Sequence, residues 1–411
     1  MLRLSRREWA WCFYDVGNSA FYTTIVAGFF PVFFKEYWSQ GVAPSLSTSY
    51  LSFASSIAAL VVALLSPALG MVASRTLGKS WLIGITGIGI LSCFMLAFLG
   101  PNQAGSALLV FAVGSASAAL ALTIYDSMMT QITTKDRYNQ LSLAGYAFGY
   151  LGGGILLALN CAMTLNPELF YLSDKAQAVK VSFISVGVWW LIFLFPLIKW
   201  VPQQKVTQLP LNTVFSGFSA LYHTASKIVT TKHMSLFLLA YWCYIDGVGT
   251  VMRMAVDYGM SLGFSSNHLI VALLIVQFLS FPCALGFIYA AEKIGAKNGL
   301  YIGIAIYCVI TIGAYFMTSV SHFYLLACGV ALAQGGLQAL SRSYFAHMIP
   351  KEQSGEYFGF YNTVGKVATI FGPLAVGVVA LVSGSNRLAI LSILILFLLG
   401  AILLGRSAYH R

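Results

Sequence analysis

Apolar residues occur along this chain in twelve long runs, separated by short breaks that contain charged residues, proline, glycine or asparagine. Each run is close to the roughly 20 residues that a helix needs to cross the hydrocarbon layer of a bilayer. The pattern predicts spanning helices near 9–34, 48–74, 80–100, 104–128, 138–164, 180–201, 233–258, 267–291, 299–319, 322–346, 357–382 and 386–405. We therefore expect an all-α, multi-pass membrane protein with twelve transmembrane helices.

The longest stretch of mixed polarity, residues 202–232, separates the sixth run from the seventh. It divides the chain into residues 1–201, a linker of residues 202–232, and residues 233–411. We predict a six-helix bundle on each side of a cytoplasmic linker.

The basic residues between the runs predict the orientation of the helices. With the N-terminus in the cytoplasm, only Lys35, Lys175, Lys180 and Arg387 fall in segments on the opposite side. Because lysine and arginine gather in cytoplasmic loops, we expect both termini to be cytoplasmic.

Composition narrows the function classes. The chain is 59% hydrophobic and 9% charged, against about 25% charged in a soluble domain. Its net charge of +11 comes from scattered single residues, so we expect no nucleic-acid partner. The seven cysteines lack metal-ligand or disulfide spacing, and no phosphate-binding loop occurs. We expect no metal, no cofactor and no direct use of ATP.

Charged residues inside a span cost about 2.5–3.5 kcal/mol each on insertion scales, so they mark a cavity, a partner or a pathway. In the first run, Tyr14, Asp15, Asn18 and Tyr22 share one helical face. This face is either the wall of a solute cavity, with Asp15 binding a proton or an ammonium group, or a hydrogen-bond network that closes the cytoplasmic side.

In the seventh run, Asp246, Arg253 and Asp257 also share a face. Arg253 and Asp257 have the spacing of an ion pair, which favours a structural lock or gate over a substrate site. Asp246 lies near the middle of its run, close to Tyr244, and both are candidates for binding solute or a proton.

The fourth, tenth and eleventh runs supply the remaining candidates. Gln338 is a candidate solute ligand, and Arg342, one turn later, is a candidate gate residue. Lys366, near Tyr361 and Asn362, needs an anion, which is either a carboxylate of the solute or Asp246 or Asp15. Asp126 is predicted to end the fourth helix as a solvated residue, to pair with the charged turn 135–137, or to handle protons.

Two short basic turns contain glycine, one from Gly70 to Lys79 and one from Gly286 to Lys297. They resemble the cytoplasmic loop signature of the major facilitator superfamily, although Ser74 replaces the usual acid. The resemblance makes Arg75 a further gating candidate.

Longer motifs are spread over nearly the whole chain: Trp9 to Phe21, Phe30 to Trp38, Val188 to Trp190, Tyr244 to Val248, Met254 to Gly259, Gln338 to Ser343, and Glu356 to Asn362 with Gly365 and Lys366. They resemble the family named for the vacuolar amino-acid effluxer of autophagy. The resemblance implies a major facilitator fold and export or exchange of a solute, with amino acids as the substrate class of the fungal members.

These observations predict a monomeric secondary transporter of a bacterial inner membrane. It would move a small zwitterionic solute, most specifically an amino acid, by alternating access coupled to protons. An exporter of an organic acid, a polyamine or a metal chelate is the alternative. No zinc-binding or nucleophile motif supports a membrane-embedded enzyme.

Overall fold

The computed structural model describes residues 3–42, 44–75, 78–203, 222, 224–368 and 371–407, apart from a few side chains within these ranges. Twelve helical segments in this part of the chain are long and apolar enough to cross a bilayer. Each coincides with one of the predicted runs, so the prediction of twelve spans is confirmed.

The first six spans form one group of helices, here called the N-terminal bundle. Its elements are α1 (Arg6–Ala20), η1 (Phe21–Phe29), α2 (Phe30–Phe33), η2 (Phe34–Trp38), α3 (Pro44–Arg75), α4 (Gly78–Phe98), α5 (Ala104–Ile132), η3 (Lys135–Arg137), α6 (Tyr138–Leu165), η4 (Pro167–Phe170) and α7 (Lys175–Trp200).

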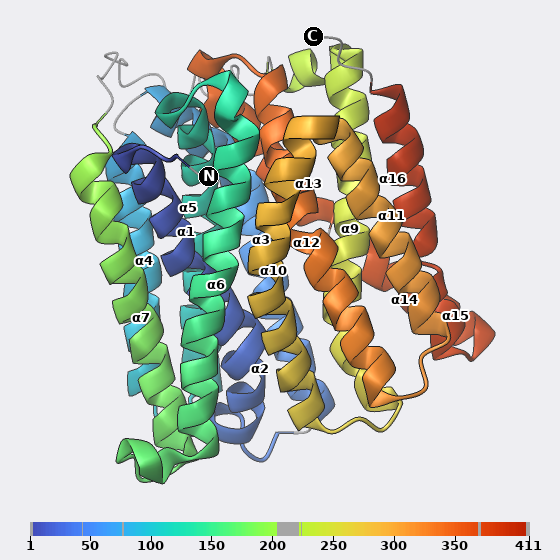
Figure 1. The fold of residues 1–411 in the computed structure, drawn as a ribbon. Helices are drawn as coiled ribbons and strands as arrows, with labels where there is room; N and C mark the ends of the chain where they lie inside the picture. The colour runs from blue at the N-terminus through green and yellow to red at the C-terminus, as the bar shows by residue number, and fades with distance from the viewer. Residues whose placement is uncertain are drawn as a thin grey trace.

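The last six spans form the C-terminal bundle. Its elements are α9 (Lys232–Ser261), α10 (Ser266–Ile294), α11 (Ala296–Tyr315), α12 (Val320–Met348), η5 (Lys351–Gln353), α13 (Ser354–Ala368), α14 (Phe371–Ser383), α15 (Asn386–Leu391) and α16 (Leu394–Arg406). The two bundles lie side by side, with α3, α6, α10 and α13 between them (Figure 1). The end of the molecule where α1 begins and α16 ends is called the terminal face below.

The first span is not a uniform α-helix. Ser5 and Glu8 form a reciprocal capping box at the start of α1, which satisfies two backbone N–H groups that have no partner within the helix. From Phe21 onward the chain takes the wider turns of a π-helix in η1 and again in η2. Helices of this type are rare and occur often at functional sites. Tyr22 lies at the start of the first π-helical segment.

The two bundles repeat one local pattern. The helices α5 and α12 each have 29 residues, and each is followed by a short 3-10 turn and another spanning helix. Asp126 precedes Ile132, the last residue of α5, by six positions, and Arg342 precedes Met348 in α12 by the same number. The two charged residues therefore occupy equivalent positions in the two bundles.

The side chains that face outward fit a bilayer rather than water. Large apolar residues such as Phe98, Leu64 and Leu381 are exposed on the spans, and a soluble protein rarely exposes so much apolar surface. The chain is therefore a multi-pass integral membrane protein.

A row of close contacts joins α3 of the N-terminal bundle to α13 of the C-terminal bundle. A Cβ atom at Gly70 would overlap the carbonyl oxygen of Gly355. One at Gly359 would lie 2.5 Å from Cα of Pro67. Further along, Thr363 donates a hydrogen bond to the carbonyl of Ala63 over 3.0 Å. The row, called the α3/α13 contact below, closes the terminal face between the bundles.

The end of one predicted span differs from the structure. The fourth span does not end at residue 128, because α5 continues through Thr130 and Gln131 to Ile132, so Asp126 lies inside the helix. Much of the predicted linker lies outside the described residues, but its later part is helical at residues 224–230. There Thr224 is buried and donates a hydrogen bond to Glu356.

Candidate functional site

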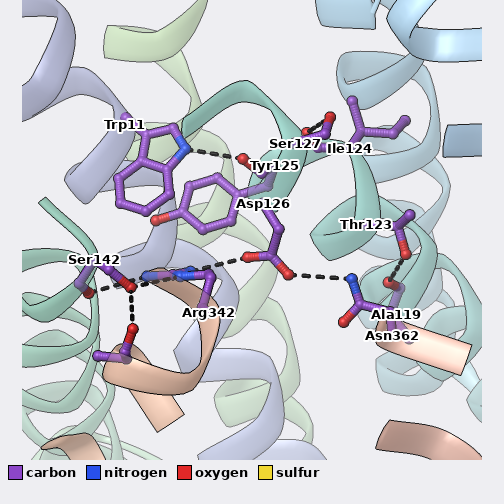
Figure 2. Close-up of polar contacts among 11 residues, drawn as sticks. Trp11, Ala119, Thr123, Ile124, Tyr125, Asp126, Ser127, Ser142, Arg342 and Asn362 are labelled. Carbon is purple, nitrogen blue, oxygen red and sulfur yellow. Dashed lines mark hydrogen bonds and ion pairs between the residues drawn. The ribbon is translucent and has the colours of Figure 1, made fainter. Parts of the chain in front are cut away.

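Arg342 joins the two bundles near the terminal face through a buried ion pair. Its guanidinium Nη1 lies 2.9 Å from Oδ1 of Asp126, and 2% of Arg342 and 5% of Asp126 are exposed. Asn362 donates a hydrogen bond from Nδ2 to the other carboxylate oxygen of Asp126. Figure 2 shows Asp126 between these two residues of the C-terminal bundle.

Ser142 at the start of α6 accepts two further hydrogen bonds from the guanidinium of Arg342. Arg342 Nε donates to Ser142 Oγ over 2.8 Å, and Nη2 donates to the Ser142 carbonyl over 3.0 Å. The hydroxyl of Ser142 in turn donates to the carbonyl of Ala339 on α12. A buried charge is tolerated when it is paired and hydrogen-bonded, and each of the three guanidinium nitrogens of Arg342 donates a hydrogen bond.

Three aromatic rings of the N-terminal bundle lie around the same guanidinium. Its Cζ is 4.7 Å from the ring centroid of Trp11, 4.5 Å from Tyr146 and 5.5 Å from Tyr125. Trp11 stacks on Tyr125 and donates a hydrogen bond to its carbonyl (Figure 2). Rings within about 6 Å of a cation attract it through their negative faces. Arg342 is thus held by both charge and aromatic contact.

The polar stripe of the first helix contacts the C-terminal bundle at its two ends. Trp11 at one end of the stripe lies beside Arg342, and Tyr22 at the other end lies beside Lys366, whose Nζ is 5.9 Å from the ring centroid. Asp15 and Asn18 lie between them on the same helical face and are buried. The stripe therefore runs between two cations of the other bundle, over about 16 Å at 1.5 Å per residue.

Glycines on α6 allow this close packing. A Cβ atom at Gly145 would lie 3.3 Å from Nη2 of Arg342 and 3.1 Å from the Tyr125 hydroxyl. One turn later, a Cβ atom at Gly149 would lie 3.4 Å from the carboxyl carbon of Asp15. Arg342 and Asp15 consequently lie over successive turns of α6, which rise about 5.4 Å apart.

Several buried polar atoms along this interface form no hydrogen bond within the described part of the chain. They are Asp15 Oδ2, Asn18 Oδ1 and Tyr22 Oη on the first span, Gln277 Oε1 on α10 and Gln334 Oε1 on α12. Tyr150 of α6 donates across the interface to Gln338 on α12 over 3.3 Å. Buried polar groups are normally satisfied, so unsatisfied ones point to water, an ion or a ligand at the site.

Three other predicted binding residues point into their own bundles. The hydroxyl of Tyr14 is 2.9 Å from that of Thr86, and the hydroxyl of Tyr244 is 2.7 Å from that of Ser341. Tyr361 stacks on Tyr241 at 4.2 Å between ring centroids. These contacts favour a role in packing for all three tyrosines.

The carboxylate of Asp246 lies at the N-terminal end of α14. Its Oδ2 accepts a hydrogen bond of 2.7 Å from the backbone N–H of Gly372, in the first turn of α14. A carboxylate in this position is stabilised by the unpaired N–H groups and dipole of the helix. Asp246 is therefore separate from the stripe that carries Asp15.

The structure places the predicted gate residues and Asp126 in different surroundings. Arg342 lies between the bundles, and its gating role stays a prediction. Asp126 is neither solvated nor paired with the turn at 135–137, because the longer α5 buries it opposite Arg342. Arg253 is exposed and donates to the carbonyl of Gly249. The side chains of Arg75 and Asp257 lie outside the described residues, so the proposed Arg253–Asp257 pair stays a prediction.

The sequence interpretation did not single out Trp11, Tyr125, Ser142 and Tyr146. Trp11 could have been found, because it lies one turn before Asp15 on the same stripe. The others come from helices whose partners only the fold identifies. Among the described residues, no group of three His, Cys, Asp or Glu side chains could hold a metal ion.

Comparison with known sequences gives a consistent family. Residues 5–411 match the family described as "Vacuole effluxer Atg22 like". The chain is 36% identical over 408 residues to the uncharacterized MFS-type transporter YxiO of Bacillus subtilis, covering 98% of this chain and 95% of that protein. It is 23% identical over 290 residues to autophagy-related protein 22 of Yarrowia lipolytica, covering 63% of this chain and 48% of the relative. The chain thus spans about half the length of that fungal relative.

Solved structures match the fold. The proton:xylose symporter XylE aligns with a TM-score of 0.69 at 15% identity, covering 97% of this chain and 93% of that chain. FucP in the outward conformation aligns with a TM-score of 0.70 at 13% identity, covering 98% of each chain. Both belong to the major facilitator superfamily, and the predicted major facilitator fold is confirmed.

Proposed function

Because this chain belongs to the Atg22-like vacuole effluxer family of major facilitator transporters, we propose that it moves a small zwitterionic solute, an amino acid, by alternating access coupled to protons. The chain is a secondary transporter and not an enzyme. The amino-acid substrate and the coupling to protons are proposed here. We also propose that the protein is a monomer in a bacterial inner membrane, with its terminal face toward the cytoplasm.

The proposed solute site is the stripe of Asp15 and Asn18 between the bundles. Asp15 would bind the ammonium group of the amino acid, and Lys366, at the Tyr22 end of the stripe, would attract its carboxylate. An acid on one bundle and a base on the other suit a solute with both charges.

The observation that carries the proposal is the carboxylate of Asp15. It is buried, and its Oδ2 forms no hydrogen bond with any described residue. A carboxylate in this setting gains most from binding a proton or a cation, because a desolvated charge is unfavourable. As the site alternates between the two sides, Asp15 would bind and release its proton.

Reconstituted protein tests the proposal directly. Liposomes containing the protein would be given an inward proton gradient, and the accumulation of radiolabelled amino acids would be measured. We expect Asp15→Asn to lose gradient-driven accumulation, because the variant lacks both the carboxylate that would carry the proton and the charge that would bind the ammonium group.

The matched control is Asp246→Asn. This substitution keeps an oxygen that can accept the hydrogen bond from Gly372 but removes the charge at the end of α14, at a cost of about 0.3–1 kcal/mol in stability, and it leaves the stripe intact. Gradient-driven accumulation that survives Asp15→Asn, or that Asp246→Asn alone abolishes, would contradict the assignment. A wild-type protein that accumulates no amino acid in sealed vesicles would direct the search to organic acids, polyamines and metal chelates.

A further inference from the structure

The rings around Arg342 form a cation site that belongs entirely to the N-terminal bundle. Trp11 comes from α1, Tyr125 from α5 and Tyr146 from α6, and together they are called the aromatic box below. Asp126 on α5 adds a carboxylate 2.9 Å from the bound guanidinium. Aromatic rings combined with a carboxylate are the arrangement by which proteins recognise organic ammonium groups.

The cation that fills the aromatic box comes from the other bundle. Arg342 is carried by α12, and its path to the box crosses the interface that alternating access must open. When the bundles separate at the terminal face, Arg342 leaves with α12, whereas the three rings and Asp126 stay together. The hydrogen bond and the stacking between Trp11 and Tyr125 support this, because both contacts lie within the N-terminal bundle.

We propose that the aromatic box, once Arg342 has withdrawn, binds the alkylammonium group of the transported solute at the terminal face. Arg342 is then a tethered competitor, which occupies the box while the terminal face is closed. The inference rests on the proposed alternating-access function and extends it to a second site.

Two atoms beside the box support an ammonium group with N–H donors. The Tyr125 hydroxyl and Asp15 Oδ2 are buried and form no hydrogen bond within the described residues. They lie over successive turns of α6, at Gly145 and Gly149. A primary ammonium in the box could donate to the Tyr125 hydroxyl and then pass to Asp15, whose carboxyl group neighbours that hydroxyl. The box would therefore be the terminal-face entrance to the site at Asp15.

Equilibrium binding to the purified protein tests the inference without a gradient. The probe is radiolabelled ethanolamine, a primary alkylammonium that has no carboxylate. We expect Arg342→Gln to bind it about tenfold more tightly than wild type, because the competing cation is removed from the aromatic box. Arg342→Lys keeps a tethered cation, so it should show little gain.

A second variant, Gly359→Trp, tests the inference if Arg342→Gln does not fold. Gly359→Trp forces α3 and α13 apart, so Arg342 should leave the aromatic box although Arg342 itself is not substituted. We therefore expect the same gain in ethanolamine binding. Adding Trp11→Leu should remove the gain in either background. Absence of a gain in both folded variants, or a gain that survives Trp11→Leu, would overturn the inference. Because the assay needs neither transport nor an amino acid, its outcome is independent of the liposome experiment.

Discussion

Arg342→Gln is expected to open the terminal face. Among the described residues, the substitution leaves Asn362 as the one hydrogen-bond partner of the buried Asp126 carboxylate. Loss of one member of a buried ion pair costs about 3–5 kcal/mol. This loss destabilises the closed state, in which the bundles meet at the terminal face, because the pair joins α5 to α12 only in that state. A cysteine at Ser354, which is fully buried and bonded to the Ser127 carbonyl, would report the change. In a background without the seven native cysteines, its labelling by a maleimide should accelerate by about tenfold or more.

Two controls separate the ion pair from a general loss of stability. Asp126→Asn/Arg342→Gln removes both charges, and its labelling rate should return toward that of wild type, because no unpaired charge stays buried. Arg137→Gln breaks the Glu8–Arg137 pair, which lies within the N-terminal bundle and is partly exposed, so it should change labelling little. An unchanged labelling rate in Arg342→Gln would show that the pair does not hold the face closed.

Gly359→Leu should have a comparable effect through packing alone. Even a Cβ atom at this position would lie 2.7 Å from the carbonyl oxygen of Ser66 and 2.5 Å from Cα of Pro67. These neighbours are backbone atoms, so the strain is relieved only when α13 moves away from α3. Overpacking of this kind costs about 1–3 kcal/mol or more, and the same labelling of a cysteine at Ser354 measures it.

Gly286→Leu is the matched control for Gly359→Leu. Gly286 is also a helical glycine of the C-terminal bundle, but a Cβ atom there would meet nothing within 4 Å. Its labelling should equal that of wild type. If Gly359→Leu also labels at the wild-type rate, the α3/α13 contact does not control opening.

The candidate site was only partly predictable from the sequence. The stripe of Asp15, Asn18 and Tyr22 follows from helical periodicity, and its burial and its position between the bundles fit the prediction of an interface. Asp246 shares the same sequence signal, a carboxylate in mid-span, yet its partner is the backbone of Gly372. Periodicity identifies the face of a helix on which a residue lies, but the neighbour of that face depends on how the helices pack.

The sequence by itself determined the number of spans, their approximate ends and the family. These properties depend on the length and polarity of single segments, because the bilayer requires each span to be apolar and to satisfy its own backbone hydrogen bonds. The tertiary structure decided the partners of the charged residues. Asp126 and Arg342 are more than two hundred positions apart, and only the meeting of α1, α5, α6 and α12 shows that one guanidinium pairs with a carboxylate inside three aromatic rings.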